Sequence, residues 1–186
     1  MLTETYISVD VETAGPVPGL YALLSIGACL VKDPSTTFYI ELQPDAPDST
    51  PEAIAVHGLS LETLGETGIP PKEALQAFAA WIQRVAPEGR RAVFVAFNAP
   101  FDWMFINSYF HRYLGYNPFG HSALDIKAYF MGQAGVTWAK TSMKHISSRY
   151  LEETHLSHNA LQDAQDQAQI FQHILDRAQR TIETRG

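Results

Sequence analysis

The order of strand and helix patterns along the chain restricts its fold more than any other feature of the sequence. Residues 6–10, 23–31 and 37–42 are β-branched, apolar or alternating segments, and they predict three strands with no helix between them. Direct succession of this kind favours an antiparallel meander. After residue 71 helical and strand patterns alternate, which is typical of a mixed α/β sheet covered by helices.

The second part of the chain supplies the other elements of a sheet of about five strands. Residues 92–97 are wholly apolar, so this strand is expected inside the sheet. Gly115 is expected to cap the helix that precedes it. The remaining expected elements are helices at about residues 71–85, 100–114 and 141–150, a helix after residue 125, a helix from about residue 160 to beyond 178, and a short fifth strand at residues 123–125.

Size and composition are consistent with one domain spanning residues 1–186. The chain is 46% hydrophobic, which suffices for a full core, and no linker-like tract, repeat or low-complexity run divides it. Cys29 is the single cysteine, so an internal disulfide and a cysteine-based zinc site are excluded. It lies in an apolar run and is expected to be a buried core thiol, not a nucleophile.

Charge and the N-terminal residues restrict the partners and the location. A net charge of −7 argues against a protein that coats long duplexes, because such binding needs a broad basic face. The charge is compatible with an enzyme that binds a few nucleotides at one end of a nucleic-acid strand. Glu4 and Asp10 interrupt the N-terminal apolar residues, a basic leader is missing, and no stretch is long and apolar enough to span a bilayer. We therefore expect a cytoplasmic protein with no membrane partner.

A pair of acids ends the first expected strand. Asp10 and Glu12 are two residues apart, so both side chains point to the same face of a regular strand. Adjacent carboxylates raise each other's pKa unless a cation lies between them. The pair is a candidate metal site; a pair of solvated acids at a strand end is the alternative.

A third acid follows the apolar strand. Asn98 is expected to cap the next helix and Pro100 is tolerated in its first turn, which places Asp102 in the first or second turn. Clefts in open α/β sheets form at such strand ends. The alternative role for Asp102 is that of an acid favoured by the helix dipole.

The third segment, His158-Asn-Ala-Leu-Gln-Asp163, has capping-box spacing, with Asn159 as N-cap and Gln162 at the third helical position. His158 and Asp163 then occupy the two positions that a hydrophobic staple normally brings into contact. Polar residues at both positions lack the apolar contact that would stabilise the start of the helix. This loss of local stability indicates a functional requirement. A surface histidine near a helix start is the alternative.

Together these residues carry a resemblance. Asp10-x-Glu12, Asn98-x-x-Phe-Asp102 and His158-x-x-x-x-Asp163 match, in order and spacing, the three motifs of the DEDDh (DnaQ-like) 3′–5′ exonuclease superfamily, and they span nearly the whole chain. His57-Gly58 also resembles a turn found in the proofreading-subunit and ribonuclease T branches. Ala14 and Ser25 depart from residues frequent in relatives, which weakens an assignment to the proofreading branch but leaves the motif acids intact.

The resemblance implies a ribonuclease-H-like fold and a phosphodiester hydrolase. Single-stranded nucleic acid 3′ ends or short oligonucleotides would be its partners, and nucleoside 5′-monophosphates its products. His158 would be the general base, consistent with a histidine that titrates near neutral pH. Oxygen ligands suit Mg²⁺ or Mn²⁺, two of which could stabilise both oxygens of an in-line displacement. The four implied metal ligands, which with His158 form the catalytic set, are Asp10, Glu12, Asp102 and Asp163.

Substrate contacts and oligomeric state are further expectations. The backbone at Thr13 and Ala14, His57 and Phe101 are candidate substrate contacts, and Trp138 is among the aromatics that could stack on a base. Such aromatics are more often core residues. The basic residues Lys140, Lys144 and Arg149 could meet phosphates, although a solvated helix face is their commoner role. A homodimer is expected by analogy only.

Two other functions stay open at this point. One is a non-catalytic nucleic-acid-binding or scaffold domain on the same fold, which the loss of a motif acid would favour; no motif acid is lost. The other is a phosphodiesterase for small nucleotides, which the low positive charge allows. The sequence gives no basis for choosing between DNA and RNA.

Overall fold

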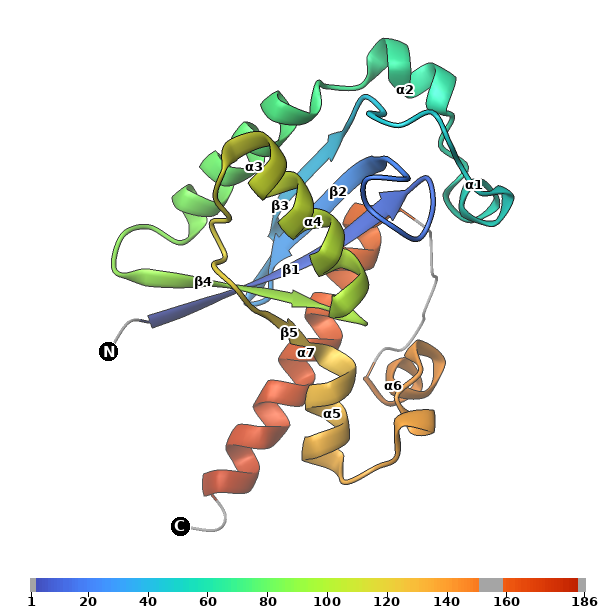
Figure 1. Cartoon of the computed structure of the whole chain (residues 1–186). Helices are drawn as coiled ribbons and strands as arrows, with labels where there is room; N and C mark the ends of the chain where they lie inside the picture. Colours follow the sequence, from blue (N-terminus) through green and yellow to red (C-terminus); the bar gives the residue numbers. More distant parts are fainter. Residues whose placement is uncertain (1–2, 151–158, 184–186) are drawn as a thin grey trace.

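The computed structural model describes residues 3–150 and 159–183, and of residues 149 and 179–183 it describes the backbone alone. Within this part of the chain a twisted sheet lies between two layers of helices (Figure 1). The strands are β1 (Thr3–Thr13), β2 (Leu23–Leu30), β3 (Asp33–Glu41), β4 (Arg90–Ala96) and β5 (Ala123–Asp125). The helices are α1 (Pro51–His57), α2 (Leu61–Thr67), α3 (Pro71–Val85), α4 (Ala99–Leu114), α5 (Ile126–Ala134), the short 3₁₀ helix η1 (Trp138–Lys140), α6 (Met143–Tyr150) and α7 (Ala160–Glu183).

The sheet has the order β3-β2-β1-β4-β5. β1 pairs antiparallel with β2, and β2 antiparallel with β3, so the expected meander is confirmed. β4 runs parallel to both β1 and β5. The expected mixed α/β sheet of about five strands is confirmed, with β1 at its centre and β4 as an inner strand.

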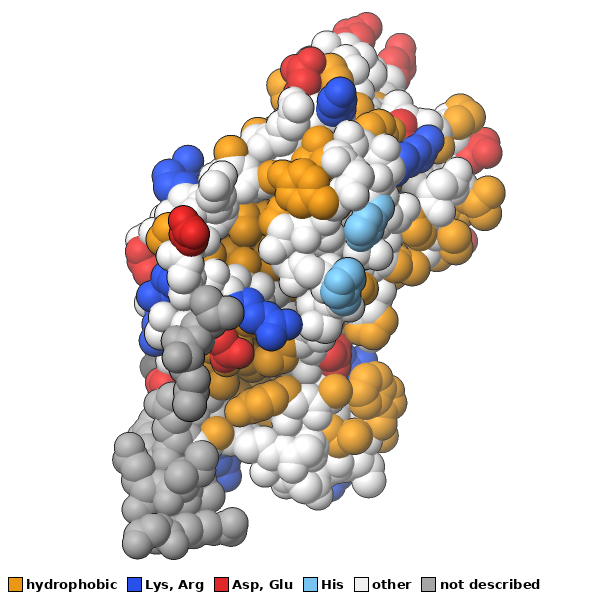
Figure 2. All heavy atoms as spheres, turned by 60° about the vertical axis from the view of Figure 1, so that its left-hand side comes forward, with side chains coloured by type: hydrophobic (Ala, Val, Ile, Leu, Met, Phe, Trp, Pro, Cys, Tyr) orange, Lys and Arg blue, Asp and Glu red, His pale blue; other side chains and the backbone are white. Residues whose placement is uncertain are grey.

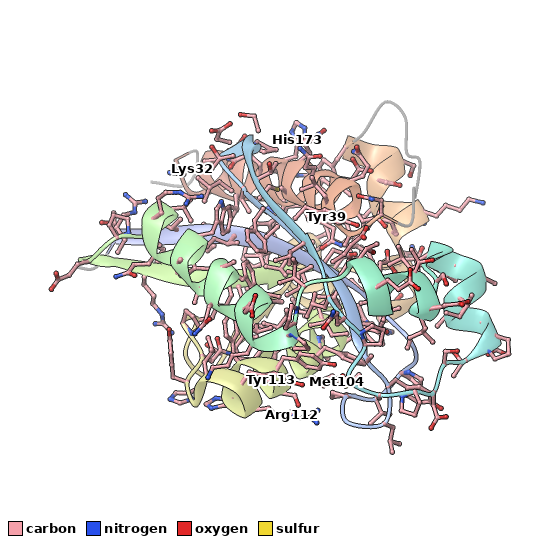
Figure 3. The ribbon with its side chains drawn as sticks, turned by 90° about the horizontal axis from the view of Figure 1, so that it is seen from above. Lys32, Tyr39, Met104, Arg112, Tyr113 and His173 are labelled. Atoms are coloured by element: carbon pink, nitrogen blue, oxygen red, sulfur yellow. The ribbon has the colours of Figure 1, made fainter. Side chains whose placement is uncertain are left out.

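Each face of the sheet packs against its own group of helices. One hydrophobic cluster joins β1, β2 and β4 to α3 and α4, and a second joins the other face to α5, α6 and α7. Figure 3, seen from above, shows this division: Arg112 and Tyr113 lie with α4 on one side, and His173 lies with α7 on the other. Strand periodicity explains the layers, because alternate side chains of one strand point to opposite faces.

The alternation along β1 decides where its acids point. Ile7, Val9 and Val11 belong to the cluster formed with α3 and α4. Asp10 and Glu12 therefore point to the opposite face, which α7 covers. The buried Cys29 also faces α7, and burial raises its pKa to about 12, so the expectation of an inert core thiol is confirmed.

Two features of the fold differ from the sequence-based expectations. Residues 51–67 contain the helices α1 and α2, which were not predicted; Thr50 and Ser60 cap them. Asn98 occupies the N-cap position of α4, but its backbone is left-handed (φ 66°) and its side chain makes no capping hydrogen bond. Instead the Ala99 N–H donates to Asp125 Oδ2 at 2.7 Å, so the predicted capping role of Asn98 was wrong.

The described surface mixes charged and apolar side chains. On the face shown in Figure 2, Lys and Arg side chains lie interspersed with acidic and hydrophobic ones. Among the described residues, none of the helices has both the length and the apolar character that crossing a bilayer demands.

Candidate active site

Three carboxylates from two distant segments meet at the end of β1. One oxygen from each of Asp10, Glu12 and Asp163 lies within 4.8 Å of the other two, a spacing that would allow them to hold a metal ion. Asp10 is partly exposed, whereas Glu12 and Asp163 are buried. The structure thus brings together three of the four acids that the sequence motifs selected, across 150 residues of chain.

A glycine in β2 allows α7 to reach this position. Gly27 pairs with Asp10 across the sheet, and a Cβ atom built on Gly27 would lie 2.1 Å from the Ala160 carbonyl carbon. The first turn of α7 therefore rests directly on the backbone of β2. Asp163, one turn further on, reaches the acids of β1 because no side chain separates the helix from the strand.

The fourth acid, Asp102, approaches from the other side of β1. It is the fourth residue of α4 and only 4% exposed, and its Oδ1 accepts the Val11 N–H at 3.2 Å. This hydrogen bond fixes Asp102 between the two ligand positions of β1. It lies outside the group of three acids, yet its charge acts on Asp10 more strongly than those of the other acids.

Gln167, one turn after Asp163, orients Asp10. Its Oε1 accepts the Phe97 N–H at 2.9 Å, and its Nε2 donates to Asp10 Oδ1 at 2.6 Å. A backbone N–H can only donate, so the orientation of the buried amide is fixed and Nε2 must face the carboxylate. Sequence reasoning missed Gln167, because α7 is rich in glutamine and nothing in the pattern distinguishes this one.

The electrostatics of the group favour a cation. Burial raises the pKa of the Asp10 carboxyl well above its usual range, and the charge of Asp102 adds to this. Burial and then the charge of Asp163 raise the pKa of Glu12 to about 8. Burial also raises the pKa of Asp102, although backbone N–H groups oppose this. A divalent cation would supply the positive charge that the ionised carboxylates need.

A pocket of about 470 Å³ opens beside Glu12. It lies between the end of β1, α1 and the first turn of α4. Its wall is mainly apolar with a few polar groups, so it offers both a stacking surface and hydrogen-bonding groups. Its lining residues include Glu12, Thr13, Pro16, Val56, His57 and Phe101.

His57 is held in one neutral form at this pocket. The Leu59 N–H donates to His57 Nδ1 at 2.9 Å, so Nδ1 is an acceptor and the ring proton lies on Nε2. Nε2 then donates to the Thr13 carbonyl at 3.3 Å. Burial lowers the pKa of His57, which agrees with a neutral ring. The imidazole thus links α1 to the end of β1 while it lines the pocket.

The other candidate substrate contacts divide into two groups. Phe101 and Thr13 line the pocket. Ala14 is fully buried; its N–H donates to Ala22 O at 2.9 Å and its carbonyl accepts the Thr50 N–H at 2.8 Å. The backbone N–H and carbonyl of Ala14 are therefore both engaged in hydrogen bonds within the protein.

The start of the third motif is described from Asn159 onward, and His158 lies outside the described residues. Asn159 Oδ1 accepts the N–H groups of Leu161 and Gln162, so the expected N-cap is confirmed. The Gln162 side chain donates to Asp166 at 2.9 Å, forward along the helix, where a capping box would have it reach back.

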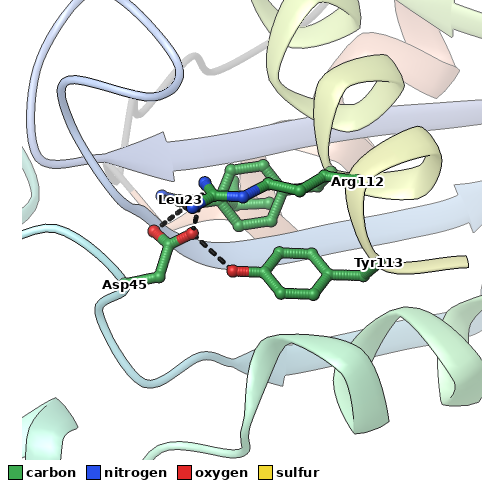
Figure 4. Close-up of polar contacts among 5 residues, drawn as sticks. Leu23, Asp45, Arg112 and Tyr113 are labelled. Atoms are coloured by element: carbon green, nitrogen blue, oxygen red, sulfur yellow. Dashed lines mark hydrogen bonds and ion pairs between the residues drawn. The ribbon is translucent and has the colours of Figure 1, made fainter.

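Asp45 joins the loop after β3 to α4 and to the start of β2 through a group of hydrogen bonds, called here the Asp45 clamp (Figure 4). Asp45 accepts hydrogen bonds from Tyr109 at 2.5 Å and Tyr113 at 2.6 Å, and pairs with Arg112 at 2.9 Å. The Tyr109 hydroxyl in turn accepts the Leu23 N–H at 2.7 Å. Leu23 lies opposite the register shift at Glu12/Thr13, so the clamp holds the irregular end of the β1–β2 pair against α4.

Comparison with known proteins assigns the fold and the motifs to one family. The family model described as the 3′-5′ exoribonuclease Rv2179c-like domain matches residues 5–175. A protein of Escherichia coli named 3′-5′ DNA exonuclease Cap18 is 48% identical over 171 residues, which cover 92% of this chain and 91% of that protein. Ribonuclease T of Enterobacter sp. (strain 638) is 27% identical over 94% of this chain and 82% of its own length.

Solved structures share the fold at lower identity. The nuclease domain of 3′hExo, a DEDDh family member bound to rAMP, matches with a TM-score of 0.76 and 15% identity over 93% of this chain and 92% of that one. E. coli exonuclease I in complex with a dT13 oligonucleotide matches with a TM-score of 0.73 and 16% identity; this chain spans 43% of its length. The ribonuclease-H-like fold expected from the motifs is confirmed. The chain belongs to the Rv2179c-like 3′-5′ exoribonuclease domain family, and it is a 3′–5′ exonuclease.

Proposed function

We propose that residues 1–186 form one exonuclease domain that removes nucleotides from the 3′ end of single-stranded nucleic acid with two divalent cations, Mg²⁺ or Mn²⁺. Asp10, Glu12, Asp102 and Asp163 would hold the cations. The observation that carries this proposal is the meeting of three carboxylates within 4.8 Å, with Asp102 bound to the backbone between two of them. The donor set agrees, because both ions prefer oxygen ligands.

Each part of the site has a role in this proposal. Two bound cations would stabilise the attacking and the leaving oxygens of an in-line displacement. His158 would act as the general base that takes the proton of the attacking water. Thr13, His57 and Phe101 would contact the terminal nucleotide in the adjoining pocket, where stacking on an aromatic ring contributes about 1–3 kcal/mol per base. The products would be nucleoside 5′-monophosphates.

Single-stranded DNA is the first substrate that we propose, because the relative at 48% identity is named a DNA exonuclease. RNA is the second candidate, supported by the description of the family model and by the ribonuclease T relatives. A homodimer and a cytoplasmic location stay predictions from the sequence.

The test is the degradation of matched DNA and RNA oligonucleotides of graded length, labelled at the 5′ end, with Mg²⁺ and with chelator. The proposal expects stepwise shortening of 5′-labelled strands that chelator stops, with nucleoside 5′-monophosphates released. Cleavage of dinucleotides alone would favour a small-nucleotide phosphodiesterase. Binding without any metal-dependent shortening would favour a scaffold domain. Either of these results contradicts the proposal.

A further inference from the structure

The segment between the second and third motifs has a charge opposite to that of the chain. Residues 126–150 contain the basic residues Lys127, Lys140, Lys144 and Arg149 and not one aspartate or glutamate, although the whole chain carries 20 acidic and 13 basic residues. These residues form α5, η1 and α6, which lie together beside α7 (Figure 1). An acid-free basic segment in an acidic protein indicates an anionic partner.

An exposed aromatic ring lies within this segment. Trp138 is 53% exposed, while Trp81 is 3% exposed and Trp103 packs edge-on against Phe94. Lys127 Nζ lies 4.3 Å from the centroid of the Trp138 ring and 5.8 Å from that of Phe97. The lysine thus holds the indole in place by a cation–π contact, and more than half of the tryptophan stays accessible.

A continuous series of contacts joins this surface to the carboxylates. Lys127 Nζ lies over the Phe97 ring, the Phe97 N–H donates to Gln167, and Gln167 donates to Asp10. The N-terminus of α5 makes a second connection. Asp125 caps α5 through the Ala128 N–H at 2.6 Å and also binds the Ala99 N–H at the start of the helix that carries Asp102. The basic surface therefore adjoins the acidic site.

The remaining lysines extend the surface over η1 and α6. Lys140 ends η1, which contacts α5, and Lys144 lies in the first turn of α6, which packs against α7. Both side chains are exposed. Exposed lysines on neighbouring helices can contact the phosphates of a strand whose last nucleotide lies at the carboxylates.

We propose that α5, η1 and α6 bind the part of a single strand that precedes the terminal nucleotide, with Trp138 stacking on a base and Lys127, Lys140 and Lys144 contacting phosphates. This inference rests on the proposed function, since it requires a 3′ end at the carboxylates. Physical chemistry favours it: the carboxylates and the net charge of −7 repel a polyanion, so a long substrate needs a local basic surface with an aromatic stacking group.

The first experiment compares two substrates in the full-length protein. One is a 30-nucleotide oligo-dT, and the other is the nitrophenyl ester of thymidine 5′-monophosphate, which has no preceding strand. In the double variant Lys140→Glu/Lys144→Glu, kcat/KM for the 30-mer should fall at least tenfold more than kcat/KM for the ester. The slope of log kcat/KM against log salt should become shallower by about 0.7 for each phosphate contact removed.

The matched control is Lys72→Glu, which changes an exposed lysine on α3. This variant should behave as wild type on both substrates.

The second experiment uses tryptophan fluorescence as a readout independent of activity. An oligo-dT with phosphorothioate linkages at its 3′ end, added with Mg²⁺, should quench the wild-type emission. Trp138→Phe should remove most of this quenching, because Trp81 is buried and Trp103 is partly buried against Phe94, whereas Trp138 is 53% exposed. The phenyl ring still stacks, so affinity should change little, whereas Trp138→Ala should weaken binding.

The outcomes separate the two proposals. If the wild type hydrolyses the 30-mer, but the Lys140/Lys144 variant matches Lys72→Glu and the quenching survives in Trp138→Phe, the strand-binding surface is overturned while the exonuclease assignment stands. If the wild type with Mg²⁺ hydrolyses neither substrate, the proposed function fails and the inference fails with it.

Discussion

Gln167 and Asp10, 157 residues apart in the sequence, are joined by a hydrogen bond of 2.6 Å from Nε2 to Oδ1. The opposite end of the same amide accepts the Phe97 N–H, so both of its ends are engaged and the amide cannot rotate. One oxygen of Asp10 is thereby held, which orients the other. A side chain that orients a ligand in this way contributes to the affinity of a site for its ion.

Removing the Gln167 amide should weaken cation binding. In Gln167→Leu we expect Mn²⁺ affinity to fall about 10- to 100-fold, as is usual when a partner of a metal ligand is lost. The unpaired Phe97 N–H should also lower the free energy of unfolding by about 1–3 kcal/mol. Calorimetric titration and thermal unfolding measure the two effects. Gln172→Leu, on the same helix, is the matched control; unchanged Mn²⁺ affinity in Gln167→Leu would refute the orienting role.

The contact between Gly27 and Ala160 should tolerate no side chain. Gly27→Ala forces the start of α7 away from β2, and we expect an overpacking cost of about 1–3 kcal/mol together with loss of hydrolysis as Asp163 moves away. Gly65→Ala is the control, because nothing lies within 4 Å of its added methyl group. Denaturant unfolding and the oligonucleotide assay measure both effects, and a Gly27→Ala enzyme with normal activity would contradict this placement of α7.

The metal ligand Asp163 and the base His158 should be separable by mutation. Asp163→Ala should abolish hydrolysis in a protein that still folds. His158→Ala should slow hydrolysis by about 10²–10⁴-fold, the usual contribution of a general base, while Mn²⁺ affinity stays near that of the wild type. Single-turnover kinetics and calorimetry make the comparison. A collapse of Mn²⁺ affinity in His158→Ala would identify this histidine as a ligand instead.

Without metal, the stability of the protein should fall as pH rises. The pKa of Glu12 is about 8 in the folded protein and near 4.5 when unfolded, so between these values the folded state binds more protons. Stability therefore decreases with pH across this window, and the raised pKa values of Asp10 and Asp102 act in the same direction. Thermal unfolding in chelator measures the slope, which Glu12→Gln should reduce. Mn²⁺ should stabilise the protein more at pH 8 than at pH 6, and a metal-free Tm that rises over this range would contradict the account.

Sequence reasoning predicted the elements that long-range periodicity encodes. The meander, the apolar inner strand β4 and the amphipathic α7 each contain enough repeats of their pattern to be recognised, and Asn159 caps α7 as expected. It missed α1 and α2, which are seven residues each and bury only Leu64 between them. Helices that short show too little periodicity to separate them from a loop.

Site residues that act through tertiary hydrogen bonds were not predictable. The resemblance to the family's motifs selected the motif acids, and three of them meet in the structure. Gln167 has no distinguishing local pattern, and Asn98 failed as a side-chain cap because Asp125, from a different strand, binds the N-terminus of α4. The engagement of the Ala14 backbone likewise depends on Ala22 and Thr50, whose proximity the sequence does not encode.

We propose that the carboxylates of β1, α4 and α7 form one cation site. Calorimetric titration of Mn²⁺ at pH 8 into the wild type and into a folded Asp10→Asn variant measures this binding. We expect Asp10→Asn to bind Mn²⁺ at least tenfold more weakly than the wild type, with parallel loss of oligonucleotide shortening. Equal Mn²⁺ binding by the two proteins, or none by the wild type, would contradict it.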